Sequence, residues 1–255
     1  MSKLFSNLKT EGLEEAKDVI GGGFRTYETD VYENVKLKLA YTALWQGGSR
    51  YVALVFDIDG GEYEETITIT NDAGDNYYMK DGKKNQMPGF VTVNELCMAA
   101  TGEELSELDT EERQVEVWDS KEKKKVRQAR DVIVELCGTD VSLAIRKVLE
   151  PKTQKTDQVN EKGKPIYEEI EGDYTKNEIV KVFHAETRAT IAEIKKAQKD
   201  DKDIDAKFMD QWKEKWQGST YNKRKGNGKS GAGSSGSGAP KSSGADKPKT
   251  SLFKK

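Results

Sequence analysis

The period of the apolar positions changes along the chain, and in the first half it is the period of strands. Residues 35–45 and 63–70 alternate apolar and polar side chains, whereas residues 50–58 are almost continuously apolar. Alternation is typical of a half-buried strand, and a short apolar run between turn signals is typical of a fully buried one. Glycine pairs at 47–48 and 60–61 separate the three segments. The pattern therefore predicts a three-stranded antiparallel meander.

A short hairpin and a helix are predicted next, before the strand pattern resumes. Residues 77–84 contain an Asp81-Gly82 pair, which is a turn signal, and residues 90–102 have helical spacing and end on a glycine. A polar excursion is expected at 151–170. The segments that return to strand patterning are 114–118, 124–138, 141–150 and 178–185.

Two amphipathic helices are predicted after the last strand, at 186–198 and 203–217. In the second one, apolar side chains recur every four residues and share one face of the helix. These side chains are Ile204, Phe208, Trp212 and Trp216.

The element pattern favours a mainly β fold with α appendages. Many short antiparallel strands, bends at glycine pairs and one helix in mid-chain are typical of a small, partly open β-barrel, of which the OB-fold is the commonest binding version. We therefore expect an OB-fold-like barrel, followed by C-terminal helices and a disordered tail. An immunoglobulin-like sandwich is the alternative.

The predicted organisation has five parts. They are an N-terminal arm (1–23), an OB-like core (24–185), a helical extension (186–216), a flexible Gly/Ser/Lys linker (217–250) and a partner-binding tip (251–255). A segment so rich in Gly, Ser and Lys buries too little apolar surface to offset the entropy of ordering it. The linker is therefore expected to present the tip, whose side chains are Leu252, Phe253, Lys254 and Lys255.

Charge is distributed unevenly along the chain. The formal net charge is −3, but residues 217–255 hold nine Lys or Arg against Asp246 alone, a net of +8, which leaves −11 for residues 1–216. Cys97 and Cys137 lie in apolar surroundings and are expected to be reduced, buried thiols of a cytoplasmic protein. The sequence shows neither a membrane-spanning apolar run nor a secretory pattern at its start, so a soluble protein is expected.

Enzymatic chemistry is not expected. His184 is the sole histidine and follows an apolar strand pattern, so a catalytic relay is disfavoured. The GNGKS segment at 226–230 lacks the first glycine of a phosphate-binding loop. Three acids, Asp57, Asp59 and Glu62, are close together but lack the spacing of a calcium loop. We therefore predict no catalytic residue, no metal and no cofactor; a metal-dependent nuclease that uses these three acids is an alternative.

Basic and aromatic side chains gather in two segments of this acidic chain. Residues 121–130 hold six Lys or Arg against one Glu, and residues 77–84 set two tyrosines beside three lysines. Cations follow phosphates while aromatic faces stack on bases, so the two hairpins are expected to grip single-stranded nucleic acid, with residues of the first two predicted strands extending the surface. The predicted contacts are Lys36, Lys38, Tyr41, Trp45, Arg50, Tyr77, Tyr78, Lys80, Lys83, Lys84, Lys121, Lys123, Lys124, Lys125, Arg127 and Arg130.

Several stretches together resemble a known family. They are DVIVELCGTDVSLAIRKVL, EIVKVFHAETRATIAEI, DQWKEKW and the final SLFKK after a Gly/Ser/Pro/Lys linker. The chain is similar to the single-stranded DNA-binding proteins of lytic tailed bacteriophages, and most of all to the type found in short-tailed phages that carry their own RNA polymerase in the virion.

The resemblance implies a factor that coats unwound DNA during replication and recombination in the cytoplasm of the infected bacterium. In this subgroup it also implies activation of the host RNA polymerase through the C-terminal residues. Many members end instead in an acidic segment with a final phenylalanine; here Lys254 and Lys255 replace those acids. The partners of the acidic-tailed members therefore do not carry over. The remaining alternative is a protein-interaction adaptor that binds no nucleic acid.

Overall fold

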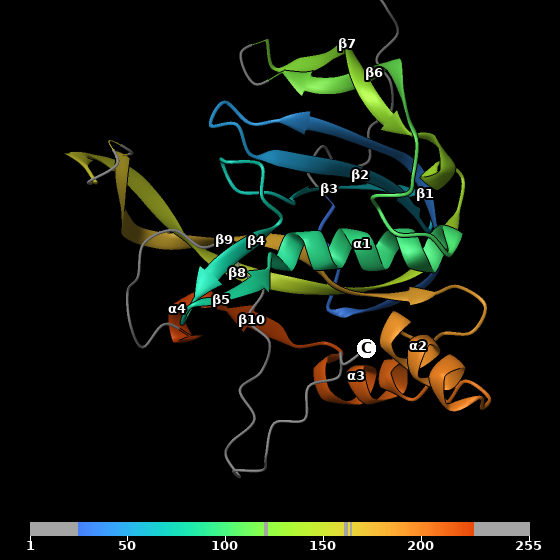
Figure 1. Cartoon of the computed structure of the whole chain (residues 1–255). Helices are drawn as coiled ribbons and strands as arrows, with labels where there is room; N and C mark the ends of the chain where they lie inside the picture. The colour runs from blue at the N-terminus through green and yellow to red at the C-terminus, as the bar shows by residue number, and fades with distance from the viewer. Residues whose placement is uncertain (1–24, 120–121, 161–162, 164, 227–255) are drawn as a thin grey trace, which may run out of the picture.

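The computed structural model describes residues 25–119, 122–160, 163 and 165–226. Figure 1 shows a mainly β protein with a few helices beside an open sheet. The strands are β1 (Asp30–Leu44), β2 (Arg50–Ile58), β3 (Gly61–Thr68), β4 (Tyr77–Lys80), β5 (Lys83–Gln86), β6 (Thr110–Asp119), β7 (Lys124–Ile133), β8 (Asp140–Val159), β9 (Pro165–His184) and β10 (Thr220–Asn222). The helices are α1 (Pro88–Thr101), α2 (Ile191–Asp200), α3 (Phe208–Trp216) and α4 (Lys223–Gly226), with a 3₁₀ turn at Val134–Leu136.

The long strand β1 organises the sheet because three strands pair with it. β2 pairs with one edge of β1, β8 pairs with the first half of the other edge, and β7 pairs with its second half. The path through the sheet runs β10-β8-β1-β2-β3, with β9 on the far edge of β8 and β6 on the far edge of β7. A register shift between Leu37 and Leu39 divides β1 into these two halves.

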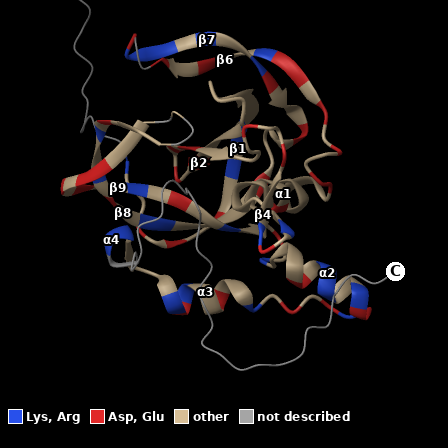
Figure 2. Ribbon diagram, turned by 60° about the vertical axis from the view of Figure 1, so that its left-hand side comes forward, with Lys and Arg blue, Asp and Glu red and all other residues tan. Residues whose placement is uncertain are grey.

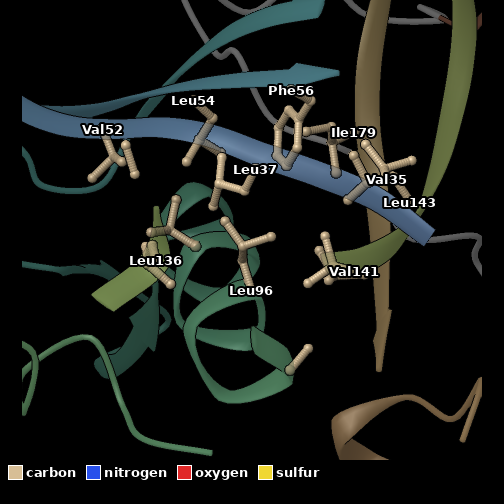
Figure 3. Packing of buried hydrophobic residues seen from close by; sticks show 14 of the residues in the cluster. Val35, Leu37, Val52, Leu54, Phe56, Leu96, Leu136, Val141, Leu143 and Ile179 are labelled. Carbon is tan, nitrogen blue, oxygen red and sulfur yellow. The ribbon is translucent and has the colours of Figure 1, made fainter. Parts of the chain in front are cut away.

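The main core lies between the sheet and α1 (Figure 3). Leu54 and Phe56 point from β2 toward α1, where Leu96 meets them, and all three are buried. The helix begins with Pro88 in its first turn and ends at Gly102, whose φ of 86° is in the left-handed region that glycine favours. Burial raises the pKa of the Cys97 thiol to about 12, so this cysteine is a packing residue with little thiolate character.

A second apolar cluster covers the opposite face of β1 and β2. Tyr41 and Ala53 pack there against Val115 and Val132 of the β6–β7 hairpin. Because α1 covers one face of β2 and the β6–β7 hairpin packs on part of the other, both sets of alternate residues in 50–58 are mostly apolar. The double coverage explains the unbroken apolar run in the sequence.

Helices α2 and α3 follow β9: α2 packs against the main core through Ile191 and Ile194, and α3 packs on the outside of β1, β8 and β9. Thr190 and Glu193 form a capping box at the start of α2. The face of α3 that packs on the body contains Met209 and Trp212, which contact Val31, Ala144 and Phe183. The predicted face is therefore partly wrong: Phe208 and Ile204 are 40% and 38% exposed, and Ile204 precedes the helix.

The polar excursion predicted at 151–170 is instead the far end of the β8–β9 hairpin. Each of these strands is 20 residues long, and their paired ends project from the body (Figure 1). A projecting two-stranded ribbon has no buried face, so its sequence does not alternate between apolar and polar. The strand prediction failed there because alternation reports burial and not hydrogen bonding.

The first residues of the predicted linker are also part of the fold. Thr220–Asn222 pair in parallel with Lys147–Leu149 of β8, and α4 follows directly. The predicted N-terminal arm, the linker beyond residue 226 and the partner-binding tip, with Leu252, Phe253, Lys254 and Lys255, lie outside the described residues, as does Lys121.

The sheet is open between β3 and β9. Within the described chain no backbone ladder joins these two strands. One side chain joins them instead: the Glu65 carboxylate of β3 accepts a hydrogen bond from the Ile179 N–H of β9 at 2.8 Å. It also accepts one from the Tyr63 hydroxyl at 2.6 Å.

Candidate nucleic-acid interface

The predicted contact residues fall into two groups on opposite sides of the β1–β3 sheet. The β4–β5 hairpin precedes α1 and lies on the same side of the sheet as this helix, whereas the β6–β7 hairpin lies over the other side (Figure 1). The two hairpins therefore do not form one continuous groove on the same face of the sheet, as their joint grip on a single strand would require. The sequence places the two hairpins near each other along the chain, but α1 and β6–β7 cover different faces of β2.

The β4–β5 hairpin is a small separate sheet. Asp81 and Gly82 have φ values of 52° and 71°, which a two-residue turn with both residues left-handed requires. The Lys84 ammonium lies 4.1 Å from the centroid of the Tyr77 ring, so that ring already has a cation on one face. Tyr78, Lys80, Lys83 and Lys84 are exposed, and Tyr77 is half-buried. This hairpin offers cations and one open ring, away from the other candidates.

The face of β2 and β3 opposite α1, here called the outer face, holds an aromatic platform at one end. The Trp45 ring lies 4.4 Å from the Tyr51 ring with 38° between the planes. The Trp45 indole N–H donates a hydrogen bond to the Thr68 hydroxyl at 3.1 Å, which fixes the ring across the strands. Trp45 is 47% exposed, so it presents a held, flat surface on which a base could stack.

Tyr41 does not contribute to this platform. Its side chain is 8% exposed and packs in the cluster with Ala53, Val115 and Val132. Burial also raises the pKa of its hydroxyl. The expectation that Tyr41 stacks on a base does not fit this arrangement, because its side chain is buried among residues of the sheet and the β6–β7 hairpin.

Cations of the outer face are paired with acids of the same chain. The Lys125 ammonium lies 2.8 Å from Glu62 and 3.0 Å from Glu64. Lys38 lies 3.6 Å from Asp57. These carboxylates lower the positive potential of the surface that the sequence predicts to bind phosphate.

The remaining basic candidates are placed around these pairs. Lys36 lies 3.3 Å from Asp140, and Lys124 lies 2.8 Å from Glu122. Arg50 donates to the Thr42 hydroxyl at 3.4 Å, and Arg130 donates to Gln128. Lys123 and Arg127 are exposed in the half of the β6–β7 hairpin that contains its turn. The Lys and Arg positions of β7 are blue on the ribbon in Figure 2, where the hairpin arches over the sheet.

Three residues of this surface were not predicted from the sequence. Tyr51 lies inside the apolar run, so nothing marked it as a surface ring. Glu62 and Glu64 alternate on β3 as in any strand with one solvated face. Alternation gives their side of the strand, but only the fold shows that Lys125, sixty residues later, lies against them.

A second charged cluster fixes the C-terminal segment to β8 and β9. Lys176 and Lys223 each contact Glu150 and Glu178 at 2.5–3.1 Å. These lysines lower the pKa of Glu150 and Glu178 against the opposing effect of burial. The charges of these four residues pair with one another, and Lys223 directly follows β10. The cluster therefore attaches the C-terminal end of β10 to β8 and β9.

The described part of the chain contains no group of three His, Cys, Asp or Glu side chains placed to hold an ion. Asp57 accepts from the Gly60 N–H at 3.0 Å, as expected of a turn residue, and Glu62 pairs with Lys125. Among the described helices, none is long and apolar enough to cross a membrane.

Comparison of the chain with protein-family models, with curated proteins and with solved structures gives no match.

Proposed function

We propose that this chain is a sequence-independent single-stranded DNA-binding protein of phage DNA replication and recombination, built on an OB-type body. The observation that carries the proposal is the outer face of β1–β3, where the Trp45–Tyr51 platform lies on the same surface as Lys38 and Lys125. The resemblance of the sequence to phage proteins of this kind supports the same function.

The strand order supports the OB-type body. An OB-fold is a five-stranded, partly open Greek-key barrel: its first three strands form a meander, its first strand also pairs with the fourth, and a helix lies between the third and fourth strands. Here β1, β2 and β3 form the meander, α1 follows β3, and β8 and β9 continue from the other edge of β1. The Glu65 contact to Ile179 joins β3 to β9 where a closed barrel would have a ladder. On this assignment β4–β5 and β6–β7 are insertions.

The same assignment supports the location of the site. OB-folds bind oligonucleotides on the face of their second and third strands, which here is the outer face of β2 and β3. Stacking on an exposed ring is independent of sequence because every base has a flat face. A platform with adjacent cations therefore suits unpaired DNA better than a duplex, whose bases are already stacked.

The affinity for a fluorescent oligothymidylate, measured by anisotropy at several salt concentrations, tests this function. We expect Trp45→Ala to lose roughly 1–3 kcal/mol of binding free energy, and Trp45→Phe to retain most of it. Tyr78→Ala is the matched control, because Tyr78 is 44% exposed but lies on the β4–β5 hairpin. If the unaltered protein shows no salt-sensitive binding, the alternative function remains, a protein-interaction adaptor that binds no nucleic acid. Equal losses in Trp45→Ala and Tyr78→Ala would move the site away from the outer face.

We propose a separate role for residues 251–255 in contacting partner proteins, host RNA polymerase among them. Leu252 and Phe253 supply a small apolar anchor, and Lys254 and Lys255 suit an acidic groove. Deletion of residues 251–255 should leave oligothymidylate affinity nearly unchanged while removing capture of the polymerase and transcription activation. Loss of both activities together would show that the two roles are not separate.

A further inference from the structure

The Lys125 ammonium occupies a position between two carboxylates of β3. Its Nζ donates to Glu62 at 2.8 Å and to Glu64 at 3.0 Å. The two acids alternate on β3, so both point from the outer face, and all three side chains are between 42% and 51% exposed. The contact therefore lies at the surface, where an ion from solution can reach it.

These ion pairs connect the β6–β7 hairpin to the far strand of the sheet. The base of the hairpin pairs with β1 at Tyr41 and Thr42, and Val115 packs on the sheet below. Lys125 lies near the other end of the hairpin, next to Lys124, which begins β7. The contacts to Glu62 and Glu64 thus extend across β2 and set the hairpin over the outer face.

The Lys125 ammonium is a cation that already binds two anionic groups, the carboxylates of Glu62 and Glu64. The hydrogen bond from Lys125 lowers the pKa of Glu62, and the hydrogen bonds to both acids raise the pKa of Lys125. Glu62 and Lys125 are therefore ionised near neutral pH. An ion pair this exposed is weak, because water and salt compete for both partners. A DNA phosphate has the charge of a carboxylate and accepts the same N–H donors.

We propose that Glu62 and Glu64 hold the place of DNA phosphates at Lys125 in the free protein, and that an entering single strand displaces them. The inference rests on the proposed single-stranded DNA-binding function. It adds the residue that binds the DNA backbone and the two acids that limit the affinity. Lys125 becomes a backbone-binding residue, and the two acids limit affinity because each binding event must break their contacts. A protein that coats DNA temporarily must also release it, and this competition favours release.

Affinity of the full chain for a fluorescent oligothymidylate, measured by anisotropy at fixed salt, tests the proposal. The variant is Glu62→Gln with Glu64→Gln. Its matched control is Glu168→Gln with Glu171→Gln, which makes the same charge change on exposed residues of the projecting β8–β9 ribbon. We expect the first pair to bind at least about tenfold more tightly than the unaltered protein and the second pair to stay within about threefold. Equal changes in both pairs would overturn the proposal.

A double-mutant cycle separates displacement from general repulsion of DNA by acids. In a Lys125→Gln background the two acids have no ammonium to occupy, so the gain from Glu62→Gln with Glu64→Gln should shrink at least about threefold. The same gain in both backgrounds would show that the acids act only by repulsion, and would overturn the proposal. If the unaltered protein binds no oligothymidylate at any salt concentration, the proposed function fails. If it binds and the acid pair changes nothing, only the displacement inference fails.

Discussion

At the scale of single residues, Glu65 has the most unusual surroundings in the described chain. It joins β3 to β9 through the Ile179 N–H, and it accepts from the Tyr63 hydroxyl. Burial raises the pKa of its carboxyl group from the ordinary 4.5 to about 7. The seam of the open sheet is thus closed by a group that changes charge near neutral pH.

Glu65→Gln should make stability less dependent on pH. Because the pKa is raised on folding, the native state holds more protons than the unfolded state between pH 4.5 and 7. The stability contributed by the neutral carboxyl is complete below the lower value and is lost as the pH rises through the upper one. Relative to the unaltered protein, we expect Glu65→Gln to gain roughly 1–3 kcal/mol between pH 5 and pH 8. Urea unfolding at both pH values measures this difference, with Glu64→Gln as the exposed control.

Gly89 is required by the close approach of α1 to β3. A Cβ at this position would lie 2.1 Å from the Thr68 carbonyl oxygen and 2.9 Å from Ile67 Cγ2. A backbone carbonyl cannot move aside as the end of a side chain can. We therefore expect Gly89→Ala to reduce the free energy of unfolding by about 1–3 kcal/mol, measured by urea unfolding. An unchanged midpoint of urea unfolding would mean that the first turn of α1 can move away from β3 at no cost in stability.

At the scale of elements, the projecting β8–β9 ribbon needs support because a two-stranded hairpin is only marginally stable by itself. Arg224 supplies part of it. Its guanidinium donates to the carbonyl oxygens of Ile170 and Gly172 at 2.8 and 2.9 Å and to Asp173 at 2.7 Å. Gly172 has a φ of 94°, so these contacts grip the ribbon where its backbone kinks. Arg224, which lies within the predicted linker, thereby holds a distant hairpin.

Arg224→Ala should loosen this ribbon without unfolding the body. We expect faster amide hydrogen exchange in residues 165–174, with the global free energy of unfolding changed by less than about 1 kcal/mol. Arg224→Lys should restore only part of the protection, because one ammonium cannot reproduce a planar fork of donors. Unaltered exchange in Arg224→Ala would show that strand pairing alone holds the ribbon.

At the scale of the whole molecule, an acidic body and a basic C-terminal segment act on DNA in opposite senses. Residues 227–255 contain six lysines and one aspartate. Figure 2 shows acidic and basic positions interspersed along the ribbon of the body, and many of these residues form ion pairs. In the proposed function, long-range attraction of a phosphate chain comes from the C-terminal segment, and stacking comes from the outer face.

Removal of residues 227–255 should slow association with oligothymidylate more than it speeds dissociation. Steering by distant charge acts on the association rate and falls with ionic strength. Stopped-flow measurements at low and high salt should show a deficit at low salt that nearly vanishes at high salt. A deficit confined to dissociation would mean that these residues contact the bound strand directly.

The sequence determined the local elements of this protein, and tertiary structure decided how they meet. Alternation and glycine signals predicted β2, the β4–β5 turn and α1 closely, because each depends on neighbours a few residues away. The β8–β9 ribbon and the pairing of β10 were missed, because exposed pairing leaves no hydrophobic period. The same limit applied at the site: the sequence supplied Trp45 and Lys125, but only the fold buried Tyr41, separated the two hairpins and set Lys125 against Glu62 and Glu64. Contacts between residues far apart in the chain depend on which face each element covers, and a local pattern does not encode that.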